Sequence, residues 1–154
     1  MLIALDKGGR FAGEPAGAGF KPLAAYVHGK GLTFGIHLMR GIPRQAVKAN
    51  LPVAGTNVRA ADIANTSDIC PWNPDMFGVD MTRPGAQAYY DSVFELIASW
   101  DVDFVKVDDL SRPYFDHQPE IEAIRKAIDK AVAKTGRPMV LSTSPGETAI
   151  VKAR

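Results

Sequence analysis

The sequence lacks several features that would narrow its function at once. A single cysteine, Cys70, excludes an internal disulfide and leaves the cellular compartment open. Lys and Arg together number 18 and Asp and Glu 17, so a formal net charge of +1 gives no reason to expect nucleic acid or an anionic membrane as partner. No apolar run reaches the length of a membrane span. We find no Gly-rich phosphate loop and no His or Cys cluster with metal-ligand spacing, and we therefore expect no cofactor and no metal.

What remains is the composition of an ordinary globular domain. The chain has 154 residues, of which 46% are apolar and 23% charged, and it is long enough to bury a real core. Residues 1–5 are apolar but too few for a signal peptide, and Asp6 and Lys7 follow directly. We expect the chain to begin within a larger domain.

Helical and strand patterns alternate along the sequence. Apolar stripes predict helices over residues 20–29 and 84–100, the second capped by Thr82, and a third helix opened by Pro119 and stopped by Gly136. Short apolar runs predict strands over residues 33–39, 103–109 and 138–144, and the glycines at 8–9 predict a turn. Residues 40–83, dotted with prolines, are expected to form a long functional loop, in which Arg40 and Arg44 are solvated or paired across it.

This order predicts an α/β fold with parallel strands. Polar residues gather where the predicted strands end, namely His37, Asp108 with Asp109, and Ser142 with Ser144. Parallel α/β folds place their sites at that edge of the sheet. A closed barrel needs eight strands and about 250 residues, so the sequence predicts either a small open sheet or part of a barrel.

The predicted strand at residues 103–109 carries a lysine and a carboxylate on one face. Because strand side chains alternate, Phe104, Lys106 and Asp108 point one way and Val105 and Val107 the other. A lysine beside an aspartate favours the ionised carboxylate, which suits a nucleophile or an electrostatic catalyst. The alternative is an aspartate that closes the strand into a turn, with Lys106 extended to solvent at the rim.

Several of these segments together resemble a known family. The runs at residues 31–37 and 104–109, the helix Leu-Ala-Ala-Tyr-Val-His-Gly-Lys-Gly at 23–31, and the spacing of Cys70, Pro74 and Phe77-Gly78 resemble the retaining α-galactosidases (melibiases) of glycoside hydrolase family twenty-seven. The resemblance covers roughly residues 11–146. It implies that residues 1–154 are an incomplete catalytic (β/α)8 TIM barrel domain, truncated at both ends, with about three helices and the third to fifth strands of the barrel.

The resemblance also implies roles for particular residues. It places the catalytic nucleophile at Asp108 and its charge partner at Lys106. His37 stands where the family usually has a tyrosine in the substrate pocket, and Ser144 falls near the substituent at C2 of the sugar. Trp72 either stacks on a sugar ring or fills the core, and Cys70 either lines the pocket or is buried and inert.

The chain departs from the family's pattern in three places. The Asp-Asp pair and Trp that hold the sugar hydroxyls on the second strand, and the acid/base Asp on the sixth, have no counterpart here. The family often has a cysteine two residues after the nucleophile, bridged to the loop cysteine, but Leu110 stands there, so Cys70 cannot make that bridge. Asp109 is a candidate substrate contact or stand-in acid, although the strand pleat would point it away from Asp108.

We therefore expect a fragment of a retaining hydrolase for terminal α-D-galactosides or related oligosaccharides, inactive by itself because the acid/base is missing. One alternative is a family relative that acts on α-N-acetylgalactosaminides or β-L-arabinopyranosides. Another is a non-catalytic α/β ligand-binding domain. Open sheet edges lead us to expect association with further copies of the chain.

Overall fold

A three-stranded parallel sheet lies at the centre of the fold. In the computed structural model, which describes residues 18–111 and 114–144, the strands are β1 (Gly35–Met39), β5 (Phe104–Asp108) and β6 (Val140–Thr143), in the order β1-β5-β6. The register pairs His37 with Lys106 and Lys106 with Ser142. The three strands therefore end at one common edge, as the alternating pattern predicts.

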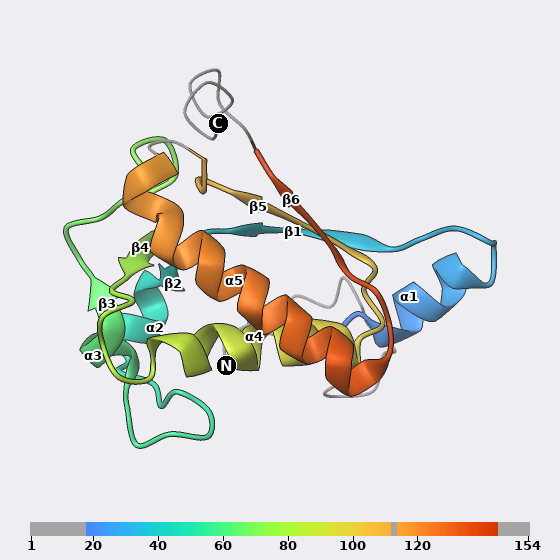
Figure 1. Cartoon of the computed structure of the whole chain (residues 1–154), viewed down its shortest axis with the longest axis horizontal. Coiled ribbons are helices and arrows are strands. Elements are labelled where there is room, and N and C mark those ends of the chain that lie inside the picture. The colour runs from blue at the N-terminus through green and yellow to red at the C-terminus, as the bar shows by residue number, and fades with distance from the viewer. Residues whose placement is uncertain (1–17, 112–113, 145–154) are drawn as a thin grey trace.

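Two long helices cover one face of this sheet. α4 (Ala86–Ser99) and α5 (Tyr114–Thr135) pack against each other and against the sheet (Figure 1). Val105 and Val107 of β5 are fully buried on this side. They share one core with residues of both helices, among them Phe94, Ile97, Ile124 and Ile128. The alternation in β5 is confirmed, because Phe104, Lys106 and Asp108 are all less buried than the two valines.

The shape of α5 explains its close contact with α4. Ala123, Ala127 and Ala131 recur every four residues and are all buried. Residues at this spacing lie on one helix face, and small side chains there let two helices approach closely. The first helix of the chain, α1 (Lys21–His28), lies apart from this pair, near the start of the strands (Figure 1). Its His28 contacts Asp103 at a distance of 2.6 Å from Nε2 to Oδ2.

The long segment between β1 and α4 is not the structureless loop that the sequence predicts. It contains α2 (Arg44–Lys48), α3 (Ala60–Ile63) and a second sheet of β2 (Ile42–Pro43), β4 (Met76–Val79) and β3 (Ala64–Asn65), in the order β2-β4-β3. The pairing is antiparallel and each strand has two to four residues. Strands this short carry no readable alternation, and for that reason the pattern missed them.

Two predicted helix starts are wrong. α5 begins at Tyr114, so Pro119 lies inside the helix instead of opening it. Proline there removes only the bond to the carbonyl of Phe115, near the exposed helix start, where water can replace it. At α4 the N-cap is Gly85, at a φ of 89°, and Thr82 instead donates its hydroxyl to Asp80. The turn predicted at 8–9 lies outside the described residues.

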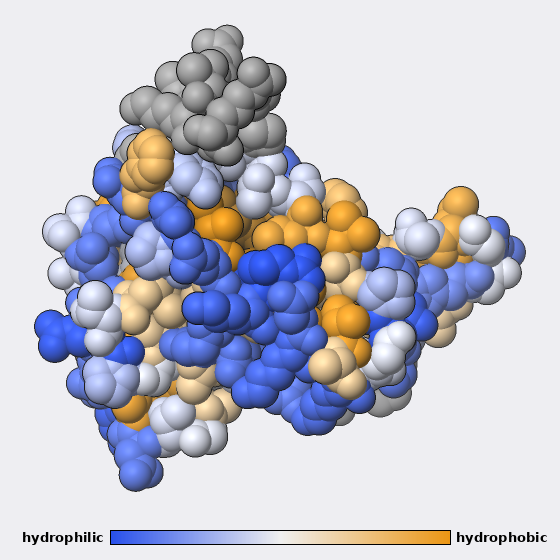
Figure 2. Space-filling view, in the orientation of Figure 1, coloured by the Kyte–Doolittle hydropathy of each residue, from blue (hydrophilic) through white to orange (hydrophobic). Residues whose placement is uncertain are grey.

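The surface over the helices carries both hydrophilic and apolar residues. Figure 2 shows mostly hydrophilic residues over α4 and α5, with apolar residues exposed next to them. On the sheet face opposite the helices, Phe104 is 39% exposed and Val140 57% exposed. None of the described helices is both long and apolar enough to cross a membrane.

Gly41 permits the chain to turn sharply after β1. It has a φ of 92°, and a Cβ atom built there would lie 2.0 Å from the carbonyl oxygen of Phe77. Gly55 has a similar φ of 72° but has nothing within 4 Å of such a Cβ. A substitution at Gly55 therefore introduces backbone strain alone, whereas the same substitution at Gly41 introduces both backbone strain and a steric clash.

We predict that Gly55→Ala lowers the free energy of unfolding by about 1 kcal/mol, because alanine disfavours a positive φ. Gly41→Ala should lower it by clearly more, because the methyl group also displaces β4. Urea unfolding of both variants, followed by circular dichroism, measures the difference. Equal losses in the two variants would contradict the close approach of Gly41 to Phe77.

Candidate active site

Lys106 and Asp108 lie side by side on the sheet face opposite the helices. The Nζ atom of Lys106 is 3.1 Å from Oδ1 of Asp108 and 3.3 Å from Oδ2. The side chain of Asp108 is 17% exposed and that of Lys106 is 44% exposed. The ammonium group is therefore partly hydrated, while its partner carboxylate lies largely within the protein.

The two neighbouring strands supply further partners for the same carboxylate. From β1, the Nε2 atom of His37 lies 2.8 Å from Oδ2 of Asp108. From the residue after β6, the hydroxyl of Ser144 donates a hydrogen bond to Oδ1. Three parallel strands thus each contribute a polar group to Asp108, which is possible because their carboxyl ends meet at one edge.

These contacts favour the ionised form of Asp108. The hydrogen bond from Ser144 lowers the pKa of this carboxyl below its ordinary value of 3.8, and partial burial opposes that effect. Hydrogen bonds from Lys106 and His37 and the charge of Lys106 lower the pKa further. At neutral pH the side chain is an anion, which is the form a nucleophile needs.

Asp108 opens into a cavity of about 470 Å³. Ser144 and Asp109 line it beside Asp108, and Trp72, which is 64% exposed, lines it from the segment between β3 and β4. Cys70 is a free cysteine, 3% exposed, and is not among the residues that line this cavity. The structure thus brings Lys106, His37, Ser144 and Trp72 to Asp108 or its cavity, and leaves Cys70 in the core.

Asp109 faces a different partner from Asp108. Its φ is 61°, and its carboxylate binds the guanidinium of Arg40 with an Nη2 to Oδ2 distance of 2.9 Å. Arg40 was expected to be either solvated or paired across the long segment. It is paired across that segment with Asp68, and it also binds Asp109, which lies outside it. The sequence did not indicate that Arg40 is 4% exposed. Its position directly after β1, at the same edge as the other polar strand ends, is the signal that was available.

Two buried residues of α5 near this site were also missed. Glu120 binds Arg40, and His117 lies with its Nε2 atom 3.9 Å from Oδ1 of Asp68. Both fall in the first turns of a helix whose start was placed too late, so neither was recognised as facing the sheet edge. Among the described residues, no group of three or more His, Cys, Asp or Glu is arranged to hold a metal ion.

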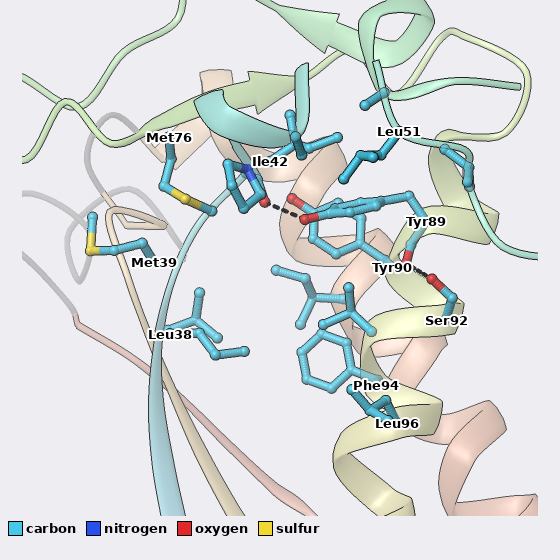
Figure 3. A pocket seen from close by; sticks show the side chains of 18 of the residues that line it. Leu38, Met39, Ile42, Leu51, Met76, Tyr89, Tyr90, Ser92, Phe94 and Leu96 are labelled. Atoms are coloured by element: carbon cyan, nitrogen blue, oxygen red, sulfur yellow. Dashed lines mark hydrogen bonds between the residues drawn. The ribbon is translucent and has the colours of Figure 1, made fainter. Parts of the chain in front are cut away.

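A second cavity, of about 340 Å³, lies between β1 and α4 (Figure 3). Most of its lining is apolar, including Leu38, Ile42 and Phe94. The hydroxyl of Tyr89 points into this region but already donates to the carbonyl of Gly41 at 3.0 Å. This cavity lacks the convergent charged groups that surround Asp108, and we place the candidate site at Asp108.

Solved structures resemble this chain in both fold and sequence. A GH27 β-L-arabinopyranosidase from Geobacillus stearothermophilus is 61% identical, with a TM-score of 0.81, over 89% of this chain and 31% of that one. The chain is related to the glycoside hydrolases of family twenty-seven. A putative α-N-acetylgalactosaminidase from Bacillus halodurans C-125 is 58% identical, with a TM-score of 0.78, over 89% of this chain and 32% of that one.

The relationship extends to a curated protein at lower identity. Alpha-galactosidase 3 from Hypocrea jecorina is 29% identical over 148 residues, which are 92% of this chain and 22% of that protein. No protein-family model matches the chain. The chain thus spans about a third of the solved glycosidases and less of the curated one. Its parallel strands and helices form part of a (β/α) barrel, as expected from the resemblance.

We predict that Ser144→Ala raises the pKa of Asp108 toward 3.8, because a hydrogen bond that favours the anion is removed. Carbon-13 NMR titration of the aspartate carboxyls measures this pKa. Ser99→Ala, which removes a serine hydroxyl bound to a helix carbonyl instead, is the matched control.

The same change has a consequence for stability. A lowered folded-state pKa stabilises the fold above the ordinary pKa, and the benefit disappears as the pH falls through the folded-state value. Ser144→Ala should therefore destabilise the chain at neutral pH and have a smaller effect near pH ~2. An unchanged Asp108 titration would show that Ser144 does not stabilise the anion.

Proposed function

We propose that this chain supplies the nucleophile half of a retaining glycosidase site. Asp108 attacks the anomeric carbon of a terminal sugar, a carbon–oxygen bond to the enzyme forms, and the bond to the departing oxygen breaks. Water later hydrolyses the glycosyl-aspartate. The observation that supports this proposal is the convergence of Lys106, His37 and Ser144 on one cavity-lining carboxylate.

The departing oxygen needs a proton from a second carboxyl group, roughly 5 Å from the nucleophile in retaining enzymes. Apart from Asp108, the described carboxylates that line the cavity are Asp68 and Asp109. Both accept hydrogen bonds from Arg40, so their oxygens are already engaged with its guanidinium. For Asp68 the hydrogen bonds and charge of Arg40 also lower the pKa, although partial burial opposes that effect, and this makes it a poor proton donor. The proton therefore comes from a residue outside the described part of the chain.

The substrate we propose is a terminal α-D-galactoside. A β-L-arabinopyranoside is the second candidate, because a GH27 β-L-arabinopyranosidase is 61% identical to this chain whereas the α-galactosidase is 29% identical. The two sugars have the same ring stereochemistry and differ by the hydroxymethyl group at C5. An α-N-acetylgalactosaminide is a third, since Ser144 is a small residue where the resemblance places the C2 substituent.

Covalent trapping tests the proposed role of Asp108. We suggest grafting this chain into the Geobacillus enzyme in place of its matching segment, which restores a full barrel. Treatment with a fluorinated galactosyl reagent should then label the peptide that contains Asp108, as read by mass mapping, because the slowed hydrolysis preserves the intermediate.

Two variants control this experiment. Asp108→Asn should abolish the label, whereas Asp129→Asn, an exposed aspartate on α5, should leave it unchanged. A folded graft that carries no label, or carries it on another carboxylate, would refute the proposal and favour a non-catalytic ligand-binding domain.

The chain by itself should not turn over an aryl α-galactoside. Asp108 lacks a second carboxyl group among the described residues that could activate water, so the glycosyl-aspartate would not be hydrolysed and the chain would not complete a catalytic cycle. Release of nitrophenol by the purified chain is the measurement. Hydrolysis that is present in the chain and lost in Asp108→Asn would contradict this prediction.

A further inference from the structure

Arg40 uses every N–H group of its side chain on the segments around the cavity. Nε donates to the carbonyl of Asp109 at 2.8 Å, and Nη2 donates to the Asp109 carboxylate at 2.9 Å. Nη1 and Nη2 bind the two oxygens of Asp68 at 2.7 and 2.8 Å. Nη1 also donates to Glu120 at 2.6 Å. A guanidinium has five N–H donors, and all of them have an acceptor here.

The Asp109 contacts fix the backbone that follows the nucleophile. Asp109 has a φ of 61°, a conformation that costs a non-glycine residue about 1 kcal/mol. Arg40 binds both the carbonyl and the carboxylate of this residue, and its own backbone N–H donates to the carbonyl of Asp108 at 3.1 Å. Arg40 thus holds the end of β5 through hydrogen bonds to both Asp108 and Asp109, and this fixes the direction in which the Asp108 side chain points.

The Asp68 contacts hold the part of the cavity lining that includes Trp72. Asp68 lies four residues before Trp72, and both line the cavity with Asp108. The paired hydrogen bonds from the guanidinium fork determine the orientation of Asp68 as well as its distance. Its backbone carbonyl also accepts a hydrogen bond from the N–H of Gly78 in β4 at 2.8 Å. The Trp72 segment, residues 68–72, is therefore bound to Arg40 through its first residue.

The third partner anchors Arg40 to the helices. Glu120 of α5 binds Arg40 through one oxygen, and its other oxygen accepts a hydrogen bond from the hydroxyl of Tyr90 of α4. Burial raises the pKa of Glu120, and Arg40 and Tyr90 partly offset that shift. The guanidinium cannot move without disturbing the packed pair of helices behind it.

We propose that Arg40 is a positioning residue that holds the Asp108 strand end and the Trp72 segment in one fixed arrangement around the cavity. It does not contact the Asp108 carboxylate and acts through the backbone. A buried ionic cluster contributes little net stability, which leaves orientation as the benefit of placing one here. This inference rests on the proposed role of Asp108 as nucleophile.

Arg40→Lys in the graft described above tests the inference. Lysine keeps the charge but has three N–H donors and no planar fork, so it cannot reproduce the five hydrogen bonds of Arg40 or its paired bonds to Asp68. We expect kcat to fall about 10- to 100-fold with a smaller change in KM, because a displacement of about 1 Å at the reacting atom has an effect of that size. Arg125→Lys, in an exposed arginine–aspartate pair on α5, is the matched control and should keep the parent's kcat.

Asp68→Asn tests the contribution of the Asp68 contacts separately from that of the Asp109 contacts. It weakens the hold on the Trp72 segment but leaves the Arg40 contacts with Asp109 in place, so KM should rise more than kcat falls. This variant also decides the matter if Arg40→Lys does not fold. Variants that lower the melting temperature but keep the parent's kcat and KM would show that Arg40 is only a stabilising residue, and the inference would be wrong.

A measurement on the chain itself keeps this inference separate from the proposed function. If the graft carries no label at Asp108, the proposed function fails. Carbon-13 NMR of the isolated chain then tests whether Arg40 positions Asp108. Arg40→Lys should then shift the carboxyl resonance and titration midpoint of Asp108, which Arg125→Lys should leave in place. An Asp108 signal that is the same in Arg40→Lys and the parent chain would overturn the inference.

Discussion

The parallel register of β1, β5 and β6 is the constraint on which the site depends. Because His37 pairs with Lys106 and Lys106 with Ser142, alternate residues of the three strands fall in rows on the same face of the sheet. All three strands also end at one edge, so the polar residues that terminate them converge without any long loop to position them. An antiparallel partner in place of β1 would have its amino end at this edge, so Arg40, which directly follows β1, would lie at the other end of the sheet.

Two electrostatic groups at this edge have different physical settings and therefore different roles. The first surrounds Asp108, where the side chains of Lys106 and His37 are 44% and 53% exposed, so these two side chains are hydrated and able to rearrange around a ligand. The second surrounds Arg40, whose side chain is 3% exposed. In that drier environment each hydrogen bond is stronger and an unmatched group more costly, which suits a fixed support. The Asp108 carboxylate thus lies in the hydrated group, and the backbone that follows it is held by the buried one.

The sequence predicted the parts of this site that depend on local periodicity. Alternation in a single strand was enough to place Lys106 beside Asp108, and apolar stripes were enough to find the helices that cover the sheet. The Arg40 cluster depends on tertiary contact, since Asp68, Asp109 and Glu120 lie 28, 69 and 80 residues away in the sequence. Periodicity carries no information at such separations. An arginine after a strand is read from sequence as solvent-exposed unless its carboxylate partners are already placed in space.

The arginine cluster also explains how this site can do without a disulfide. The family resemblance implies a bridge between the cysteine of the long segment and the position that Leu110 occupies here, but Cys70 is a free thiol. Arg40 joins Asp68, two residues before Cys70, to Asp109, one residue before Leu110. The same two segments are therefore connected by charge-assisted hydrogen bonds instead of a covalent bond. Such a connection needs no oxidising compartment, but it requires that the carboxyl of Asp68 remain ionised. The hydrogen bonds and charge of Arg40 favour that state by lowering the pKa of Asp68, although partial burial opposes them. The support of the site therefore depends on pH, whereas a disulfide would make it depend on redox potential.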